Sequence, residues 1–242
     1  MRTFASLLTA TVAMLLLGST AHAEAAVPRP FSATYAVTFR GIGAGTITFD
    51  FARDAASGHY IYETHASPST LARLFVSKAA MERSVMTIDD AGTRPIEWKL
   101  DDGTSSDEKD GELHFDWSRN RVTGVVERKP VDLPAEPGIQ DRSSISIAVT
   151  TSLLRGVEPG TIPLIDDNKI KRYIYTKKEN ATVDSALGKI DTVIYESTRE
   201  GGSSRTSRFW MAPSQEFLPV RAEQIRKGKV ETVMVLQKLE HR

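Results

Sequence analysis

The 242-residue sequence contains no cysteine, so its fold has to be stable without disulfide bonds. The residues that follow a removable N-terminal segment, 24–242, are numerous enough to bury a core of the size that this requires. Length alone is compatible with one domain or two. No stretch has the composition of a linker, and the one place for a boundary, a proline-rich loop at 130–138, is short. We therefore expect a single domain over residues 24–242.

An excess of charge of either sign is also missing. The chain has 31 lysine and arginine residues against 31 aspartate and glutamate residues. Arg2 is the one charged residue in segment 1–23, so the remainder has a net charge of −1. Nucleic-acid binding usually needs a basic face, and we therefore expect no nucleic-acid partner.

Histidine is scarce, which limits the metal chemistry of the chain. Outside the N-terminal segment there are four histidines: His59, His65, His114 and His241. His59 and His65 share one face of a predicted strand, but six residues at about 3.3 Å each place them roughly 20 Å apart. Since these two cannot bind one ion together and cysteine ligands are lacking, we expect no metal site and no cofactor.

Residues 101–112 contain six acidic side chains and resemble a calcium loop at first sight. Such a loop alternates oxygen ligands and closes with a glutamate twelve positions after its start. Here the middle, Thr104-Ser105-Ser106, has no acidic residue, whereas Asp102-Gly103 and Asp110-Gly111 are turn dipeptides. The segment is therefore predicted to be the solvated tip of a hairpin.

Motifs for catalysis are lacking as well. Residues 41–45 read Gly-Ile-Gly-Ala-Gly, but a dinucleotide fingerprint needs a helix after the glycines, and an alternating strand follows. No nucleophile elbow is present at Gly202-Ser203-Ser204. Asp141-Arg142-Ser143-Ser144 has suitable residue types, yet helix capping explains the aspartate. Asp116 beside Trp117 could be a carboxylate in a sugar cleft, but a lone acid predicts nothing. We expect no enzyme, and a hydrolase is the least favoured alternative.

The chain begins with an export signal. Arg2 gives a positive start, Leu7 to Leu17 is an apolar run, and Ala21-His22-Ala23 is a small-x-small cleavage site. This pattern is typical of a secretory signal peptide over residues 1–23. The run is shorter than the roughly twenty apolar residues of a membrane-spanning helix, and no cysteine follows that could be lipidated. We expect a soluble periplasmic protein that is neither a lipoprotein nor membrane-spanning after cleavage.

Most of the remaining chain alternates apolar and polar residues with the period of a β-strand. About a dozen such segments occur at spacings of roughly 8–15 residues, beginning at 31–39, with turn residues between them. Asp141–Leu154 instead has apolar residues at helical spacing after an aspartate N-cap, and a short helix is expected from Pro68 to Phe75. The predicted fold is mainly β, a curled antiparallel sheet or open β-barrel with one main helix packed against it.

The last strand is apolar on both faces, with Val233 and Val235 on one and Met234 and Leu236 on the other. A half-exposed sheet is apolar on one side only, so the second side has to be covered by the helix, which we favour, or by a bound hydrophobic ligand. Residues that could line a pocket for such a ligand, or could equally be core, are Tyr35, Phe49, Trp117, Trp210 and Met234.

A basic and aromatic segment runs from Lys169 to Lys178. Strand alternation places Lys171, Tyr173 and Tyr175 on one face. An edge strand protected by lysines is the simpler interpretation. The alternative is a patch that binds an anionic headgroup or an acidic partner.

Several short motifs occur in a characteristic order. They are Phe31-x-Ala33-x-Tyr35, Phe115-Asp116-Trp117, Asp141-Arg142-Ser143-Ser144, Leu187-Gly188, Trp210-x-Ala212-Pro213 and Leu218-Pro219-Val220-Arg221. Together they resemble the bacterial periplasmic and envelope family called domain of unknown function 3108, which implies no activity and no catalytic residues. The tail is also similar to the LolA/LolB-like half-barrels that carry lipoproteins across the periplasm. That resemblance implies an open sheet curled around a helix-lined hydrophobic cavity.

The sequence thus favours an exported, non-enzymatic envelope protein that binds or carries a hydrophobic or amphipathic ligand such as a lipid. The alternative is a structural or assembly module that contacts another envelope protein, with the Lys169–Lys178 segment as the contact.

Overall fold

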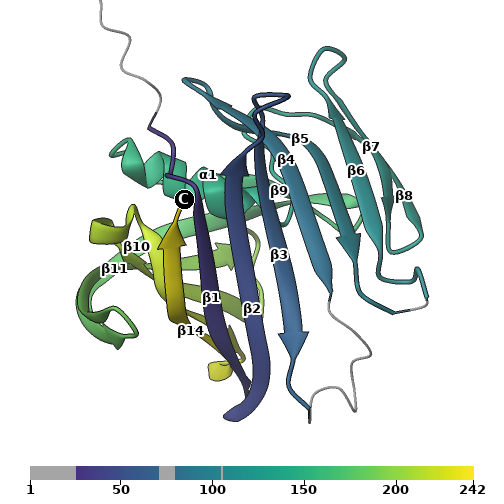
Figure 1. Ribbon diagram of the computed structural model, residues 1–242. Helices are drawn as coiled ribbons and strands as arrows, with labels where there is room; N and C mark the ends of the chain where they lie inside the picture. Colours follow the sequence, from purple (N-terminus) through teal and green to yellow (C-terminus); the bar gives the residue numbers. More distant parts are fainter. Residues whose placement is uncertain (1–25, 71–79, 105) are drawn as a thin grey trace, which may run out of the picture.

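The structure is a computed structural model that describes residues 26–70, 80–104 and 106–242 (Figure 1). The predicted signal peptide, residues 1–23, lies outside the described residues, as do residues 71–75 of the short predicted helix. Pro68, expected to start that helix, is instead the last residue of a strand.

The described residues form fourteen β-strands, one α-helix and one short 3-10 helix. The strands are Phe31–Phe39 (β1), Ile42–Arg53 (β2), Tyr60–Pro68 (β3), Met81–Asp89 (β4), Gly92–Asp101 (β5), Gly111–Asp116 (β6), Arg121–Val126 (β7), Lys129–Pro134 (β8), Thr161–Asp166 (β9), Lys169–Ser185 (β10), Gly188–Arg199 (β11), Arg205–Ala212 (β12), Leu218–Arg226 (β13) and Lys229–His241 (β14). Helix α1 covers Ser144–Leu154, and the 3-10 helix η2 covers Pro213–Gln215.

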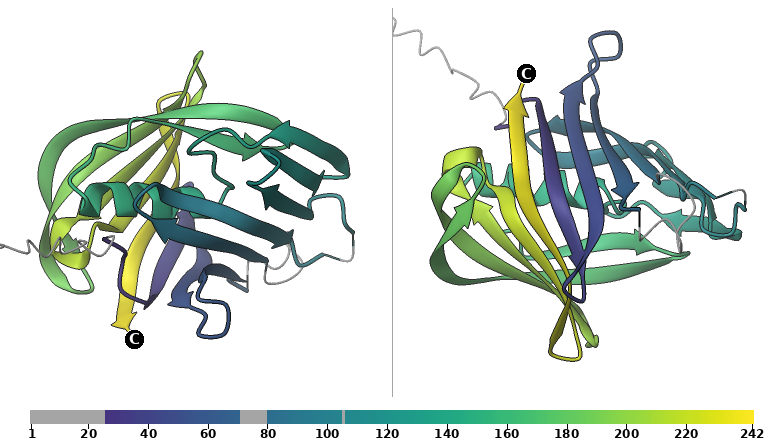
Figure 2. Two further views of the ribbon diagram at one scale, coloured as in Figure 1. Left: turned by 90° about the horizontal axis from the view of Figure 1, so that it is seen from above. Right: turned by 60° about the horizontal axis from the view of Figure 1, so that its bottom comes forward.

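All fourteen strands belong to one antiparallel sheet in the order β8-β7-β6-β5-β4-β3-β2-β1-β14-β13-β12-β11-β10-β9. Two meanders, β1–β8 and β9–β14, are therefore joined where the first strand pairs with the last, from Phe31 opposite His241 to Phe39 opposite Thr232. The sheet curls but does not close into a barrel (Figure 2). The predicted fold class, a curled antiparallel sheet with one main helix, is confirmed.

The glycine-rich segment 41–45 is only partly a turn. Arg40 and Gly41, both with positive φ, form the two-residue turn, and β2 begins at Ile42. Gly45 lies inside β2, where a Cβ atom would collide with the carbonyl oxygen of Ser67 on β3. This glycine is therefore required by the close approach of β3 and not by the reversal of the chain.

Helix α1 lies on the concave side of the sheet (Figure 2) and contacts β5 and β4. It begins at Ser144, three residues later than predicted, and its N-cap is Ser143 and not the predicted Asp141, which precedes the first turn and binds it through its carboxylate. Its buried residues include Ile147 and Thr150 as well as Ile145, Val149 and Leu153. A helix buried on more than one side packs between elements and not on a single face.

The core consists of three clusters of buried side chains. The central cluster joins β1–β4, β11–β14 and the helix residue Ile147. The helix cluster joins α1 to β9, β11 and β12. The wing cluster fills the concave side of the wing, which we define as strands β5–β8. Its members are Trp98, Leu113, Phe115, Val122, Val126, Val131, Ala135, Ile139 and Ile165.

Candidate ligand-binding cavity

A cavity of about 180 Å³ lies between helix α1 and the concave face of the sheet. The lining comes from strands β1–β3 and β10–β14 and from the middle of the helix. The lining residues are Phe31, Tyr35, Phe49, Tyr62, Ser146, Ile147, Val149, Thr150, Tyr175, Tyr195, Phe209, Met211, Leu218, Pro219, Ala222 and Met234. Strand alternation places these side chains on the inner face, and the helix supplies the opposite wall.

Aromatic rings make up much of the cavity wall and hold one another in place. The Phe49 ring stacks on Tyr62 at 5.8 Å between centroids and meets Tyr35 edge-on at 5.4 Å. The Tyr175 and Phe209 rings stack at 6.3 Å on the other side. Such contacts are favourable beyond the area that they bury, so the rings form a preformed wall.

The tyrosine hydroxyls of the wall are neutral donors. Tyr35 donates to the carbonyl oxygen of Pro219 at 2.7 Å, and Tyr195 donates to the Glu158 carboxylate at 2.8 Å. Burial raises the pKa of Tyr35 and Tyr62 well above the usual value, and burial likewise raises the pKa of Tyr175 to about 12. The aromatic wall thus has no charge at neutral pH.

Three of the five predicted ligand-binding residues come together in this cavity: Tyr35 from β1, Phe49 from β2 and Met234 from β14. Two lie elsewhere. Trp117 packs beside the wing cluster, where its indole nitrogen donates to the carbonyl oxygen of Pro95 at 2.7 Å. Trp210 has the guanidinium groups of Arg208 and Arg221 beside its ring, at 5.9 and 5.2 Å from the centroid.

Sequence reasoning missed several lining residues, and two kinds of signal could have found them. Phe209 and Met211 flank Trp210 on β12, so strand alternation places them on the opposite face. Choosing the tryptophan selected the wrong face of that strand. On helix α1, Ser146 and Thr150 are four positions apart and share one face, but small polar residues did not suggest a cavity wall.

Asp141 serves the start of the helix. Its carboxylate accepts the backbone N–H groups of Ser143 and Ser144 at 2.8 and 2.7 Å and the hydroxyl of Ser84 at 2.7 Å. Burial raises the pKa of Asp141 to about 6, although these hydrogen bonds favour the charged form. Asp141 and Ser144 are thus accounted for by the first turn of α1 and its attachment to β4, whereas the buried hydroxyl of Ser143 has no hydrogen-bond partner among the described residues.

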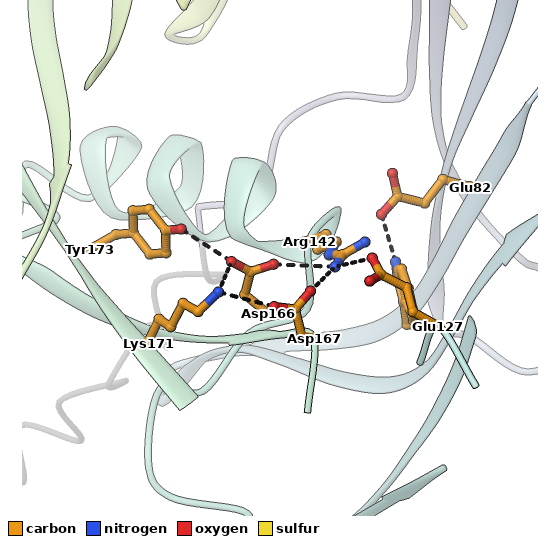
Figure 3. Close-up of polar contacts among 8 residues, drawn as sticks. Glu82, Glu127, Arg142, Asp166, Asp167, Lys171 and Tyr173 are labelled. Carbon is orange, nitrogen blue, oxygen red and sulfur yellow. Dashed lines mark hydrogen bonds and ion pairs between the residues drawn. The ribbon is translucent and has the colours of Figure 1, made fainter. Parts of the chain in front are cut away.

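Arg142 joins the two ends of the sheet. Its guanidinium lies 3.3 Å from Glu127 in the β7–β8 turn, and 3.2 and 3.3 Å from Asp166 and Asp167 at the β9–β10 turn (Figure 3). Lys171 binds Asp166 at 2.6 Å in the same network. Backbone hydrogen bonds between Gln140 and strand β9 also hold these two ends of the sheet together.

The predicted edge strand at Lys169–Lys178 is not the outermost strand, because β9 lies outside β10, but only Tyr173 and Ile174 have strand partners on both sides. Residues 169–174 pair with β9 on one side, and β11 pairs from Tyr173 onward on the other. Both Tyr173 and Tyr175 pack against the helix cluster. Lys171, Lys177 and Lys178 each have an acidic partner, so the segment is not an unpaired basic patch.

In the 101–112 segment, the carboxylates of Asp101, Asp102 and Asp110 lie within 4.8 Å of one another. Each of them accepts a nearby backbone N–H group: Asp101 that of Gly103, Asp102 that of Thr104 and Asp110 that of Asp102. Turn formation accounts for this arrangement.

The fold and the cavity define a class of protein: an open, curled antiparallel sheet around one helix and an apolar hollow. Residues 34–235 match the model of the family described as "Protein of unknown function (DUF3108)", and the chain belongs to that family. The family resemblance seen in the sequence is confirmed. No curated protein matches the sequence.

Solved structures show a related fold. A β-barrel-like protein of domain of unknown function DUF1849 from Brucella abortus superposes with a TM-score of 0.56 at 12% identity, covering 90% of this chain and 99% of that one. A protein from Bacteroides fragilis, described as exported with a YmcC-like fold, has a TM-score of 0.37 at 8% identity and coverages of 90% and 99%. Only the first likeness is strong enough to bear on the fold. Within the described ranges, no helix has the length and apolar character needed to cross a membrane.

Proposed function

We propose that this protein binds the apolar part of a hydrophobic or amphipathic ligand in its central cavity and performs no chemistry on it. The observation that supports the proposal is the hollow of about 180 Å³ between α1 and the sheet, with its aromatic and apolar lining. Hollows with a mainly apolar lining accept apolar guests.

The size of the cavity limits the guest. An engineered cavity of about 150 Å³ accepts benzene or xenon, whereas sites for drug-sized ligands span about 300–1,000 Å³. The cavity is therefore suited to one aromatic ring or the end of one hydrocarbon chain. The remainder of a longer amphipathic molecule stays outside the hollow.

The chemistry of the wall limits the guest further. Ser146 and Thr150 place hydroxyl-bearing side chains in the lining, and the tyrosines there are neutral. Burying an unpaired charge in such surroundings is costly. We therefore expect the inserted part to be uncharged, with any carboxylate or phosphate of the ligand left in water.

The proposal includes export to the periplasm and the absence of catalysis. Support for export is the signal-peptide pattern of residues 1–23. Two of the residues weighed as catalytic have structural partners: Asp141 accepts backbone N–H groups at the start of α1, and the half-buried Asp116 accepts hydrogen bonds from the Ser118 hydroxyl and the Arg119 backbone N–H. N-terminal sequencing of the protein from a periplasmic fraction tests the location, with Glu24 as the expected first residue.

The binding test uses toluene and octan-1-ol as probes, followed by saturation-transfer NMR on protein stripped of bound lipid. Ala222 lines the cavity on β13. Ala222→Trp is expected to fill the hollow and abolish both signals. Gln224→Trp, on the same strand but outside the lining, is the matched control and is expected to retain them. If Ala222→Trp fails to fold, Ser146→Leu fills the hollow from the helix side.

Wild-type protein that binds neither probe, or equal binding by the filled variant and the control, would refute the proposal. Native mass spectrometry of protein from its own cells identifies the natural guest. The alternative, an assembly module that contacts another envelope protein, predicts one dominant protein cross-link in cells and no lipid adduct.

A further inference from the structure

Three hairpin turns lie side by side at one end of the molecule: 39–42 between β1 and β2, 200–204 between β11 and β12, and 226–230 between β13 and β14. Backbone hydrogen bonds connect them, from Arg40 to the Glu231 carbonyl at 2.6 Å and from Lys227 to the Ser204 carbonyl at 2.7 Å. The β13–β14 hairpin projects beyond the sheet next to the β1–β2 turn (Figure 2). We call these three turns, with Arg205 and Glu231, the basic tip.

Apolar side chains of the tip are unusually exposed. Phe39, Ile42 and Val230 have 47%, 65% and 45% of their surface accessible. Phe39 pairs with Ile42 across the β1–β2 hairpin and with Thr232 on β14, so the three belong to neighbouring strand ends. Single exposed apolar residues need no explanation, but a group of them at the same projecting end indicates an interaction surface.

Cations are stacked across the same strand ends. Arg205 on β12 lies opposite Arg226 on β13, which in turn lies opposite Lys229 on β14. Like charges directly opposite each other are destabilising in a sheet. Within the described parts of the chain, no ion pair to a carboxylate is present for Arg205, Arg226 or Lys229. A row of like charges that is only partly compensated within the chain is a surface that an anionic partner would stabilise.

The tip also contains two acidic residues, Glu200 and Glu231, and Glu231 is the one whose charge interacts with Arg226 and Arg205 among the described residues. Glu231 accepts a hydrogen bond from Arg40 at 2.7 Å. That bond, together with the charges of Arg40, Arg226 and Arg205, holds the pKa of Glu231 below its usual value. Glu231 therefore remains ionised and offsets one cation, while the surrounding surface stays positive.

We infer that the basic tip docks on an anionic lipid bilayer, with Phe39, Ile42 and Val230 entering the interface and the cations contacting the headgroups. Basic residues near an anionic membrane each add attraction, and adjacent apolar side chains gain by leaving water at the headgroup boundary. A second copy of the chain is disfavoured because its own tip is positive. The inference does not rest on the cavity, since no residue of the tip lines it.

The test is co-sedimentation of the full purified protein with vesicles of phosphatidylcholine alone or mixed with phosphatidylglycerol, at low and high salt. We expect partition into the mixed vesicles only, weakened by salt. The double variant Arg226→Gln and Lys229→Gln is expected to lower the partition coefficient about thirtyfold. Each cation near an anionic membrane adds a similar free energy of attraction, so the two losses multiply. Ile42→Ser is expected to lower it about tenfold at both salt concentrations.

The matched control is Leu187→Ser with Lys189→Gln in the β10–β11 turn, at the other end of β11, where both residues are exposed. It is expected to partition like wild type. Absence of partition into the mixed vesicles, or an equal loss in the control, overturns the inference. The inference is also overturned if the double variant still binds the mixed vesicles, or if cross-links in cells join the tip to a protein and to no lipid.

Discussion

In the wing, the concave face of β5–β8 meets the linking segment 135–139 and Ile165 of β9, and buried aliphatic and aromatic side chains fill the space between them. Over β1–β3 and β10–β14, the concave face meets helix α1, which also contacts β5 of the wing. The helix presents Ser146 and Thr150 among its apolar residues there, and a hollow remains. Both regions have the same strand pattern. The comparison shows that the opposing element decides whether a curled sheet is filled or hollow.

Truncating one apolar side chain in the filled wing and one beside the hollow tests this difference in packing. Leu113→Ala removes a wing side chain that is 1% exposed and should cost about 3–5 kcal/mol of unfolding free energy, because the new cavity cannot collapse. Met234→Ala enlarges an existing hollow from a half-buried position and should cost only about 1–2 kcal/mol, below the usual range for such truncations. Urea unfolding measures both, and equal costs would show that the hollow is packed in solution.

The attachment of the helix can be tested through pH. Burial raises the folded-state pKa of Asp141 to about 6 from its ordinary value of 3.8, so the folded protein holds this proton more tightly than the unfolded chain. That contribution is fully present below pH 3.8 and is lost as the pH rises through 6. The difference between these two pKa values corresponds to about 3 kcal/mol of unfolding free energy.

Asp141→Asn has no such titration. Its stability relative to wild type should therefore increase by about 2 kcal/mol between pH 4 and pH 7, as measured by urea unfolding at each pH. Other carboxylates titrate equally in both proteins, so the difference isolates Asp141. A difference that does not change with pH would mean that Asp141 is not buried as described.

The junction between the halves should give the smallest effect. Arg142→Gln removes the cation that faces Glu127, Asp166 and Asp167, and a partly exposed network of this kind contributes about 1 kcal/mol. The three remaining carboxylates should then make stability rise with salt. Arg119→Gln, which removes an exposed arginine from the β6–β7 turn, is the control. Denaturation at two ionic strengths shows the contrast, which fails if both variants respond alike.

Much of the fold was predictable because strand alternation and turn residues are local properties. The helix was predictable as well, although its start was placed three residues early because Asp141 binds the first turn from outside it. Three cavity residues, Tyr35, Phe49 and Met234, followed from their strand faces. Trp117 and Trp210 did not, because which face of a strand is concave depends on how the whole sheet curls.

The pairing of sequence-distant strands also set a limit on prediction. The clustering of Arg205, Arg226 and Lys229 depends on the registers of three strands. The chain as a whole has equal numbers of positive and negative residues, so its composition did not indicate a basic surface. Similarly, β10 is not the outermost strand because the short strand β9 pairs with its residues 169–174, which residue spacing alone does not reveal.

β1 is synthesised first and β14 last, yet they pair in the middle of the sheet. Each meander can form from pairs of neighbouring strands, but the wall of the hollow is complete only when β1 and β2 have paired with β12–β14 through β14. A nascent chain therefore exposes the apolar inner face of β1–β3 to water until β14 has been synthesised. Sheets with such long-range strand pairing fold slowly and aggregate readily, so shortening the C-terminus even by one strand should leave an aggregation-prone fragment and not a smaller folded protein.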